Sequence, residues 1–118
     1  MLKFYWYPNC STCRKARKAL QLAGIPFQAI DITISPPTEK QFKSWLQSGQ
    51  AELKGFFNTS GEEYRKAGGA SLLKSRSESE LIAMLTKNGR LVKRPILADG
   101  NKATFGFRDA EAILKAWS

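Results

Sequence analysis

The chain has 118 residues, 42% of them apolar, with 19 Lys and Arg against 10 Asp and Glu, two Cys and no His. This length fits one domain, residues 1–118, while the missing His excludes Ser–His and Cys–His catalysis and, with only two Cys, a structural zinc site. No segment has the length and apolarity of a membrane span and the N-terminus lacks a signal-peptide pattern, so we expect a cytoplasmic protein with no bound metal.

The N-terminal segment predicts a strand followed by a helix. Residues 2–7 are aromatic and apolar, which favours a buried strand, and residues 10–24 predict a helix that ends at Gly24. Apolar residues repeat every three or four positions along one face of this helix: Cys13, Ala16, Leu20 and Ala23. We therefore expect Cys13 to face the core and Cys10 to lie at the helix N-terminus.

The middle of the chain predicts mainly helices. Residues 27–32 alternate in polarity and predict a second strand, parallel to the first because a helix connects the two. Thr38 with Gln41 three residues later is a capping-box pattern, which opens a helix through about residue 48. Further helical segments are expected at residues 53–57, 61–67 and 77–87.

The C-terminal part predicts a hairpin and a last helix. Residues 91–98 and 102–107 are two apolar runs on either side of the turn at residues 99–101, which favours an antiparallel pair. Asp109 is a good N-cap for a final helix that ends near Trp117.

This order of elements indicates the fold class. A βαβ half, a helical stretch and a ββα half, with a redox-type cysteine pair at the first strand–helix junction, indicate an α/β thioredoxin-like fold with a mixed four-stranded sheet. Residues 1–34 and 90–118 would form its core, and residues 35–89 would form a helical insert.

Cys10 and Cys13 form the candidate chemical centre, because a Cys-x-x-Cys pair spans about one helical turn and its sulfurs can meet. At a helix N-terminus, free backbone N–H groups and the helix dipole favour the reactive thiolate. We predict that Cys10 is the nucleophile and Cys13 the resolving thiol, in an active-site loop with Asn9, Ser11 and Thr12. The residues alone also allow half of a metal site shared with another chain, or two buried apolar side chains.

Arg94-Pro95 is the second candidate feature. On the residues alone, it is either the start of an edge strand with a solvated cation or a part of the site. In thioredoxin-like proteins the strand that faces the active-site cysteine begins with a cis-proline, so Pro95 would place Arg94 beside Cys10. Arg108, just before the last helix, would converge on the same place.

Several motifs occur together between Phe4 and Trp117: residues 7–16 (YPNCSTCRKA), Pro36-Pro37, residues 56–61 (FFNTSG) with Tyr64 and Gly68, residues 91–96 (LVKRPI) and residues 106–108 (GFR). Together they resemble the arsenate reductase family of the glutaredoxin-dependent type, whose wider group includes the Spx-type transcriptional regulators. The resemblance implies a thioredoxin-like fold with no bound cofactor. It also implies that glutathione with glutaredoxin, or thioredoxin, is the reductant.

The resemblance further implies an anion site. Arg94 and Arg108 match two arginines that hold the oxyanion in the family, and Asn58 stands where the third arginine would lie. A guanidinium suits a tetrahedral oxyanion because it donates charge-assisted, bidentate hydrogen bonds. An Asn in place of one cation would weaken oxyanion binding by about 1.5–3 kcal/mol. Trp6 stands where the family has a His.

Two functions follow as hypotheses. The first is a monomeric thiol–disulfide oxidoreductase that reduces arsenate, a related oxyanion or a thiol substrate. The second is an Spx-like regulator that binds the C-terminal domain of the RNA polymerase α subunit and is switched by a Cys10–Cys13 disulfide.

The net charge of +9 also suggests a polyanion as a partner, but the distribution of the charges along the chain argues against one. Beyond residue 30 the cations mix with acids and no nucleic-acid-binding motif is present, so we expect no direct nucleic-acid or membrane partner. The first 30 residues carry five cations and no acid. Four of these lie on the first helix, a face that is either a solvated surface or a docking site for an acidic partner protein: Arg14, Lys15, Arg17 and Lys18.

Overall fold

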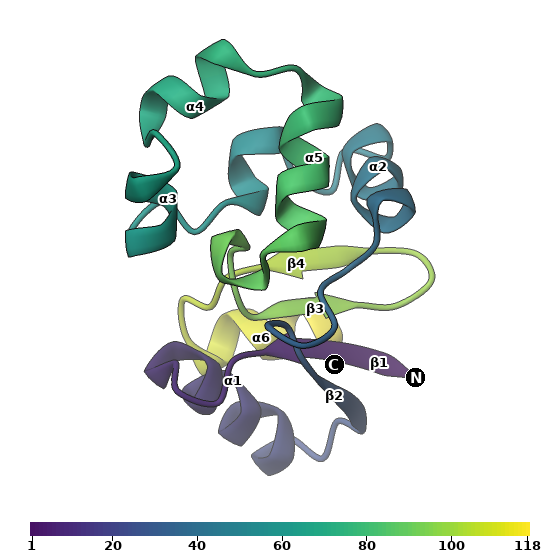
Figure 1. Ribbon diagram of the computed structural model, residues 1–118. Coiled ribbons are helices and arrows are strands. Elements are labelled where there is room, and N and C mark those ends of the chain that lie inside the picture. Colours follow the sequence, from purple (N-terminus) through teal and green to yellow (C-terminus); the bar gives the residue numbers. More distant parts are fainter. The chain divides into compact units, whose positions relative to one another are not determined.

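Figure 1 shows the computed structural model of the protein, which describes all residues from Met1 to Ser118. The chain divides into two compact units. We call residues Met1–Asp31 with Arg94–Ser118 the thiol unit, because it holds both cysteines, and residues Ile32–Lys93 the helical unit. None of the helices is long and apolar enough to span a membrane, and no three His, Cys, Asp or Glu side chains gather where they could hold a metal ion.

The thiol unit is built on a mixed four-stranded sheet with the strand order β2-β1-β3-β4. Strand β1 (Leu2–Trp6) pairs in parallel with β2 (Phe27–Asp31), as a helical crossover requires. On its other side β1 pairs antiparallel with β3 (Ile96–Ala98), which forms a hairpin with β4 (Ala103–Phe105). The expected mixed sheet, the parallel first pair and the C-terminal hairpin are therefore confirmed.

Two helices, α1 (Ser11–Leu22) and α6 (Ala110–Trp117), cover one face of this sheet (Figure 1). Helix α6 begins as expected at Asp109, whose carboxylate accepts a hydrogen bond from the Ala112 N–H at 2.8 Å. The buried core between sheet and helices draws on both sheet and helix residues: Leu2, Phe4, Ala16, Ala19, Leu20, Leu97 and Ile113. This core holds α1, and with it both cysteines, against β1.

The buried face of α1 differs from the expected one in a single residue. Cys13, Ala16 and Leu20 are buried as expected, but the fourth buried residue is Ala19 and not Ala23. Ala23 is exposed because the helix ends at Leu22, two residues earlier than expected, so that Ala23 is its C-cap. The expectation that Ala23 faces the core is therefore wrong.

The helical unit holds four short α-helices, α2 (Glu39–Gln47), α3 (Glu62–Lys66), α4 (Ala70–Ser75) and α5 (Glu78–Lys87), with 3-10 turns η1 (Leu53–Phe56) and η2 (Gly89–Leu91). Aromatic side chains form much of its core. Phe42 packs against Trp45 and Phe56 with ring centroids 5.5 and 5.2 Å apart, and Phe57 packs against Tyr64 at 6.0 Å. Phe56 and Phe57 are thus both part of this core.

Two parts of the sequence fold differently from the expectation. Helix α4 is not predicted, because Gly68-Gly69 precede it and no side chain caps its N-terminus. Residues 91–98 do not form one strand: only Ile96–Ala98 join the sheet. Residues 91–93 bond instead within the helical unit. There the Lys93 N–H donates to the Phe56 carbonyl at 2.8 Å, and Val92 forms an isolated antiparallel β-bridge with Phe57.

Candidate redox site

The first candidate residue, Cys10, occupies the N-cap of α1 as expected. After β1 ends at Trp6, a tight turn forms in which the Cys10 N–H donates to the Tyr7 carbonyl at 2.9 Å. Cys10 itself is extended, with φ −95° and ψ 116°, so that its side chain turns back over the first turn of the helix. There its Sγ accepts a hydrogen bond from the Cys13 N–H at 3.4 Å.

Cys13 lies one helical turn further on and is completely buried, whereas Cys10 is half-buried. Both are free thiols in this structure, and the Cys13 thiol hydrogen-bonds to the Cys10 sulfur. A reagent in solution can therefore reach Cys10, while Cys13 can be reached only through the neighbouring sulfur.

The surroundings of Cys10 favour its thiolate. Burial raises the pKa of Cys10, but the Cys13 amide, the Cys13 thiol and the Arg94 guanidinium together outweigh this effect and hold the pKa below its usual value. Arg94 acts through both a hydrogen bond and its positive charge. An anion is also favoured here by the helix N-terminus.

The surroundings of Cys13 have the opposite effect. Burial raises the pKa of Cys13 to about 12, against a lowering by the Tyr7 backbone, and the neighbouring Cys10 thiolate adds to the increase. Of the two thiols, Cys10 therefore ionises first, and Cys13 stays protonated to a higher pH. The first is suited to attack, and the second can attack only after it loses its proton.

Arg94 enters the site from the start of β3. The Arg94–Pro95 peptide bond is cis, Pro95 is buried, and its carbonyl accepts a hydrogen bond from the Gly106 N–H at 2.8 Å. The Arg94 Cζ atom lies 5.2 Å from the centre of the Tyr7 ring, and its Nε is buried. The guanidinium thereby lies beside the turn that carries Cys10.

Four of the predicted site residues thus come together in the thiol unit: Cys10, Cys13, Arg94 and Pro95. Arg108 does not join them in this structure. Its side chain is 82% exposed and its Nε lies 3.5 Å from the Asp109 carboxylate. Of the three residues expected in an active-site loop, only Asn9 lies in one; it is exposed and its Nδ2 donates to the Tyr7 hydroxyl at 3.4 Å. Ser11, exposed, and Thr12, half-buried, instead form the first turn of α1, because the helix already begins after the Cys10 cap.

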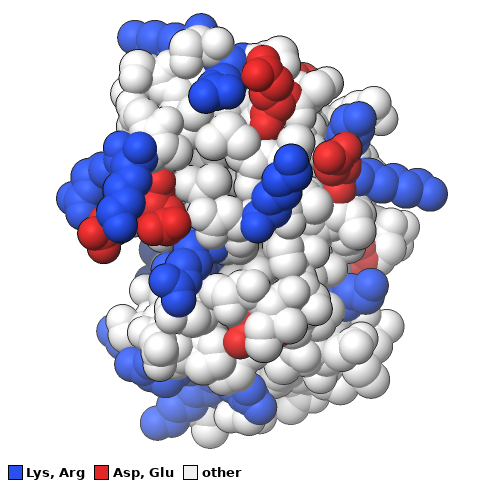
Figure 2. Space-filling view, viewed as in Figure 1, with Lys and Arg blue, Asp and Glu red and all other residues white.

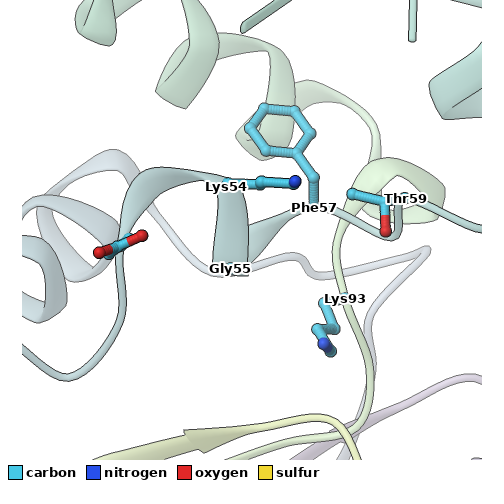
Figure 3. A pocket seen from close by; sticks show the side chains of 6 residues that line it. Lys54, Gly55, Phe57, Thr59 and Lys93 are labelled. Carbon is cyan, nitrogen blue, oxygen red and sulfur yellow. The ribbon is translucent and has the colours of Figure 1, made fainter. Parts of the chain in front are cut away.

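Asn58 belongs to the helical unit, where its backbone shapes a tight loop. Its N–H donates to the Leu91 carbonyl at 2.7 Å, and its carbonyl accepts from the Gly61 N–H at 3.0 Å. Close to this loop is a cavity of about 360 Å³ (Figure 3), lined by Glu52, Lys54, Gly55, Phe57, Thr59 and Lys93. The cations that line this cavity are therefore lysines, of which Lys93 lies in the motif at residues 91–96 and Lys54 in no motif.

Two residues that sequence reasoning did not select also shape the site. Tyr7 supplies the ring under Arg94. Arg14, selected only as part of the charged face of the first helix, donates from Nη1 to the Pro8 carbonyl at 2.8 Å and so ties α1 to the cysteine loop. The place of Tyr7 between a strand end and Pro8 is the one signal that could have indicated its role.

Trp6 packs against the core of the thiol unit. Its ring stacks on Phe4 with centroids 5.8 Å apart, and the Arg17 Cζ atom lies 4.5 Å from it. Because Trp6 packs against the core between β1 and α1, it acts as a structural residue.

A mixed four-stranded sheet with a Cys-x-x-Cys pair at the N-terminus of its first helix and a cis-proline before β3 defines a thioredoxin-like protein. Residues 5–115 match the model of the ArsC family. The chain therefore belongs to the ArsC family.

Individual relatives support this membership. The uncharacterized protein YusI of Bacillus subtilis (strain 168) is 43% identical over 108 residues, which is 92% of each chain. The global transcriptional regulator Spx 1 of Lactococcus lactis subsp. lactis is 28% identical over 111 residues, covering 94% of this chain and 85% of that protein. The crystal structure of a possible arsenate reductase from Streptococcus mutans UA159 superposes with a TM-score of 0.88 at 41% identity, covering 98% of both chains.

Proposed function

We propose that the protein is a thiol–disulfide oxidoreductase of the ArsC family in which Cys10 is the nucleophile, Cys13 resolves the covalent intermediate, and Arg94 binds an anionic substrate group. The observation that carries this proposal is the division of labour between the two sulfurs. Cys10 is accessible, capped by the Cys13 N–H and faced by Arg94, whereas Cys13 is completely buried beside it.

The reaction has two steps. In the first, the Cys10 thiolate forms a bond to the central atom of an oxyanion such as arsenate, which loses one oxygen as water, or to a sulfur of a disulfide, which releases the other sulfur as a thiolate. In the second, Cys13 loses its proton and attacks the Cys10 sulfur. The bond from Cys10 to the substrate breaks, its electron pair stays with the substrate, and a Cys10–Cys13 disulfide forms. The substrate gains two electrons and the cysteine pair loses two.

The arginines would serve the substrate and not the electron transfer. Arg94 already faces the nucleophile, so an oxyanion held by its guanidinium lies within reach of Cys10. Arg108 is the second arginine of the proposed anion site, and it would have to leave its exposed ion pair with Asp109 to take part. A surface ion pair of this kind is worth no more than about 1 kcal/mol, so the movement is inexpensive.

The disulfide must be reduced again before another cycle. Glutathione with glutaredoxin, or thioredoxin, is the proposed reductant, in a cytoplasm that keeps thiols reduced. No bound cofactor takes part in the proposed cycle.

The test is an assay of arsenate-dependent glutathione oxidation with glutaredoxin, run on the wild type, Cys10→Ser and Cys13→Ser. Loss of activity in Cys10→Ser supports the assignment of the nucleophile. Activity that survives in Cys13→Ser would show that an external thiol replaces Cys13. Inactivity of all three proteins with arsenate and with a small disulfide substrate rejects the enzyme.

A second function is favoured by the relatives named as Spx regulators, which are 28–29% identical over 94% of this chain. In that case the same Cys10–Cys13 pair is a redox switch without turnover, and the partner is the C-terminal domain of the RNA polymerase α subunit. The expected observation is saturable binding to purified α subunit that changes when the disulfide forms. Recovery of no polymerase in either redox state would remove this function.

A further inference from the structure

We propose that one exposed face of α1 is the docking surface for the protein that reduces the Cys10–Cys13 disulfide, and that this partner presents its thiol within an acidic surface. The inference rests on the proposed function, because the disulfide must form before it can be reduced. It adds where the reductant binds and what chemistry recognises it.

The docking face is defined by the helical repeat. At about 100° per residue, five residues of α1 fall on one side of the helix, opposite the buried Cys13, Ala16 and Leu20. All five are exposed: Ser11, Arg14, Lys15, Lys18 and Leu22. The face therefore starts next to the reactive Cys10, passes three cations and ends at an apolar side chain that is 79% exposed.

This face is strongly positive because nothing neutralises it. Helix α1 contains no acidic residue, and all the salt bridges of the structure lie outside it. In the helical unit, by contrast, Lys66 pairs with Glu62 and Arg76 with Glu80. Figure 2 shows blue side chains gathered over α1 with no red side chain among them. An uncompensated row of cations attracts an acidic surface and accelerates its approach.

Two of the arginines on α1 are already held in place. The Arg14 Nη1 donates to the Pro8 carbonyl at 2.8 Å, within the loop that carries Cys10. Arg17, beside the docking face, lies over the Trp6 ring at 4.5 Å and over the Phe27 ring at 5.7 Å. Immobilised side chains lose less conformational entropy on binding, which favours their use in an interface. Leu22 supplies a hydrophobic contact at the far end.

The accessibility of the sulfurs decides which bond the partner attacks. Cys13 is completely buried, so an incoming thiolate can reach only Cys10, at the end of the docking face. The partner thiolate forms a bond to Cys10 Sγ, the Cys10–Cys13 bond breaks, and Cys13 leaves as a thiolate that takes a proton from water. A second thiol of the partner then attacks its own bridging sulfur and releases Cys10 as a thiolate. The partner loses two electrons and the cysteine pair gains two.

The test uses the oxidised full-length protein and measures the rate at which its disulfide is reduced. Three thiols are compared: a cysteine peptide flanked by Glu, the same peptide flanked by Lys, and uncharged dithiothreitol. The variant K15E/K18E reverses two charges of the docking face. Its matched control is K40E/K43E, which reverses two exposed lysines at the same spacing on α2.

At low salt we expect the Glu peptide to react with the wild type about tenfold faster than the Lys peptide, with a ratio that falls as salt is added. K15E/K18E should lose or invert this preference, and K40E/K43E should keep it. Equal rates for the two peptides on the wild type, or the same loss in K40E/K43E, would overturn the proposal.

Dithiothreitol separates the two levels of the inference. It should reduce the disulfide of all three proteins at similar rates, since its thiolate has no charged flanking residues and senses the docking face far less than the peptides do. If dithiothreitol reduces the disulfide but the peptides are not distinguished, the docking surface alone is wrong. If oxidation yields no Cys10–Cys13 disulfide, the proposed function fails and the docking surface fails with it.

Discussion

The N-termini of three helices show how the thiol unit differs from the helical unit. In the helical unit, α2 and α5 begin with Thr38 and Ser77, whose hydroxyls each accept the backbone N–H three residues later at 3.2 Å. The side chains at that third position, Gln41 and Glu80, bond back to the cap at 2.9 and 3.1 Å. Both helices therefore close with a complete capping box.

Helix α1 of the thiol unit uses the same spacing with sulfur in both positions. The Cys10 Sγ accepts a hydrogen bond from the Cys13 N–H at 3.4 Å. The Cys10 N–H, however, donates to the Tyr7 carbonyl and not to the Cys13 side chain, so the capping box is incomplete. The hydroxyl of a cap such as Thr38 or Ser77 accepts its hydrogen bond and has no nucleophilic form at neutral pH. A sulfur cap is a weaker acceptor until it ionises, and then the same N–H group and dipole stabilise its thiolate. At the N-terminus of α1 a complete capping box is thus replaced by a cap whose surroundings lower the pKa of Cys10.

The largest expected effect is on the rate of alkylation, when Cys10→Ser turns the sulfur cap of α1 into a hydroxyl cap. Cys10→Ser should slow alkylation of the reduced protein by iodoacetamide at neutral pH at least about 100-fold, because the remaining Cys13 is buried and its pKa is raised to about 12 by that burial. Mass spectrometry of the modified protein gives the rate. Cys13→Ser is the control and should still be alkylated rapidly. Rapid alkylation of Cys13 in the Cys10→Ser protein would break the comparison.

A smaller effect is expected at the cation that supports the sulfur cap. Arg94→Met removes a charge that lowers the pKa of Cys10, so the alkylation rate of Cys10 at neutral pH should fall about three- to tenfold. Arg94→Lys should recover part of it. The matched control is Arg108→Met, since Arg108 is exposed and paired with Asp109, and its rate should equal that of the wild type. A change as large in Arg108→Met would place the controlling cation elsewhere.

The caps also predict a ranking of stabilities. Thr38→Ala and Ser77→Ala should each reduce the free energy of unfolding by about 1 kcal/mol. Cys10→Ala should cost less than either when measured in mild acid, where the thiol is protonated and accepts only weakly. Urea unfolding of the three variants gives the ranking. A cost for Cys10→Ala as large as for the hydroxyl caps would show that sulfur caps as well as oxygen.

The smallest expected effect is the dependence of the free energy of unfolding on pH, to which Cys10 and Cys13 contribute with opposite signs. The pKa of Cys10 is lowered in the folded protein, so its contribution to stability grows as pH rises through that value and is lost as pH falls through it. Burial raises the pKa of Cys13 to about 12, so its contribution is complete below the usual thiol pKa and is lost as pH rises toward 12.

Two alanine variants separate these contributions. The difference in unfolding free energy between wild type and Cys10→Ala should increase as pH rises toward the usual thiol pKa of about 8.5. The difference between wild type and Cys13→Ala should decrease from about pH 8.5 upward. Chemical denaturation at several pH values measures both. Differences that run parallel for the two variants would contradict the division between the sulfurs.

Local signals made much of the thiol unit predictable from the sequence. The aromatic run of β1, the Asp109 cap and the spacing of Cys10 and Cys13 each act within a few residues, so their structures follow from nearby chemistry. Arg94 and Arg108 could not be separated in the same way, since both are arginines at the ends of a hairpin. What separates them is one long-range contact: Arg94 lies over the ring of Tyr7, beside the cysteine loop, while Arg108 stays exposed and pairs only with its neighbour Asp109.

The helical unit was harder to predict for the same reason. Residues 91–93 have the composition of a strand, yet Lys93 bonds to Phe56, far away in the sequence, and only the residues after Pro95 enter the sheet. Helix α4 has no side-chain cap, so its start depends on packing such as the burial of Leu72. The cavity beside Lys54 and Lys93 likewise depends on contacts that no spacing in the sequence reports.

The most direct test of the division between the sulfurs is a titration of the reduced protein that follows thiolate absorbance in the ultraviolet, with Cys10→Ser beside the wild type. We expect two separate steps for the wild type: one below the usual cysteine pKa, where the Cys13 hydrogen bonds and Arg94 outweigh burial at Cys10, and one near 12, where burial holds Cys13 protonated. The lower step should vanish in Cys10→Ser. A single step for both thiols near about 8.5, or a lower step that persists in Cys10→Ser, would contradict the account.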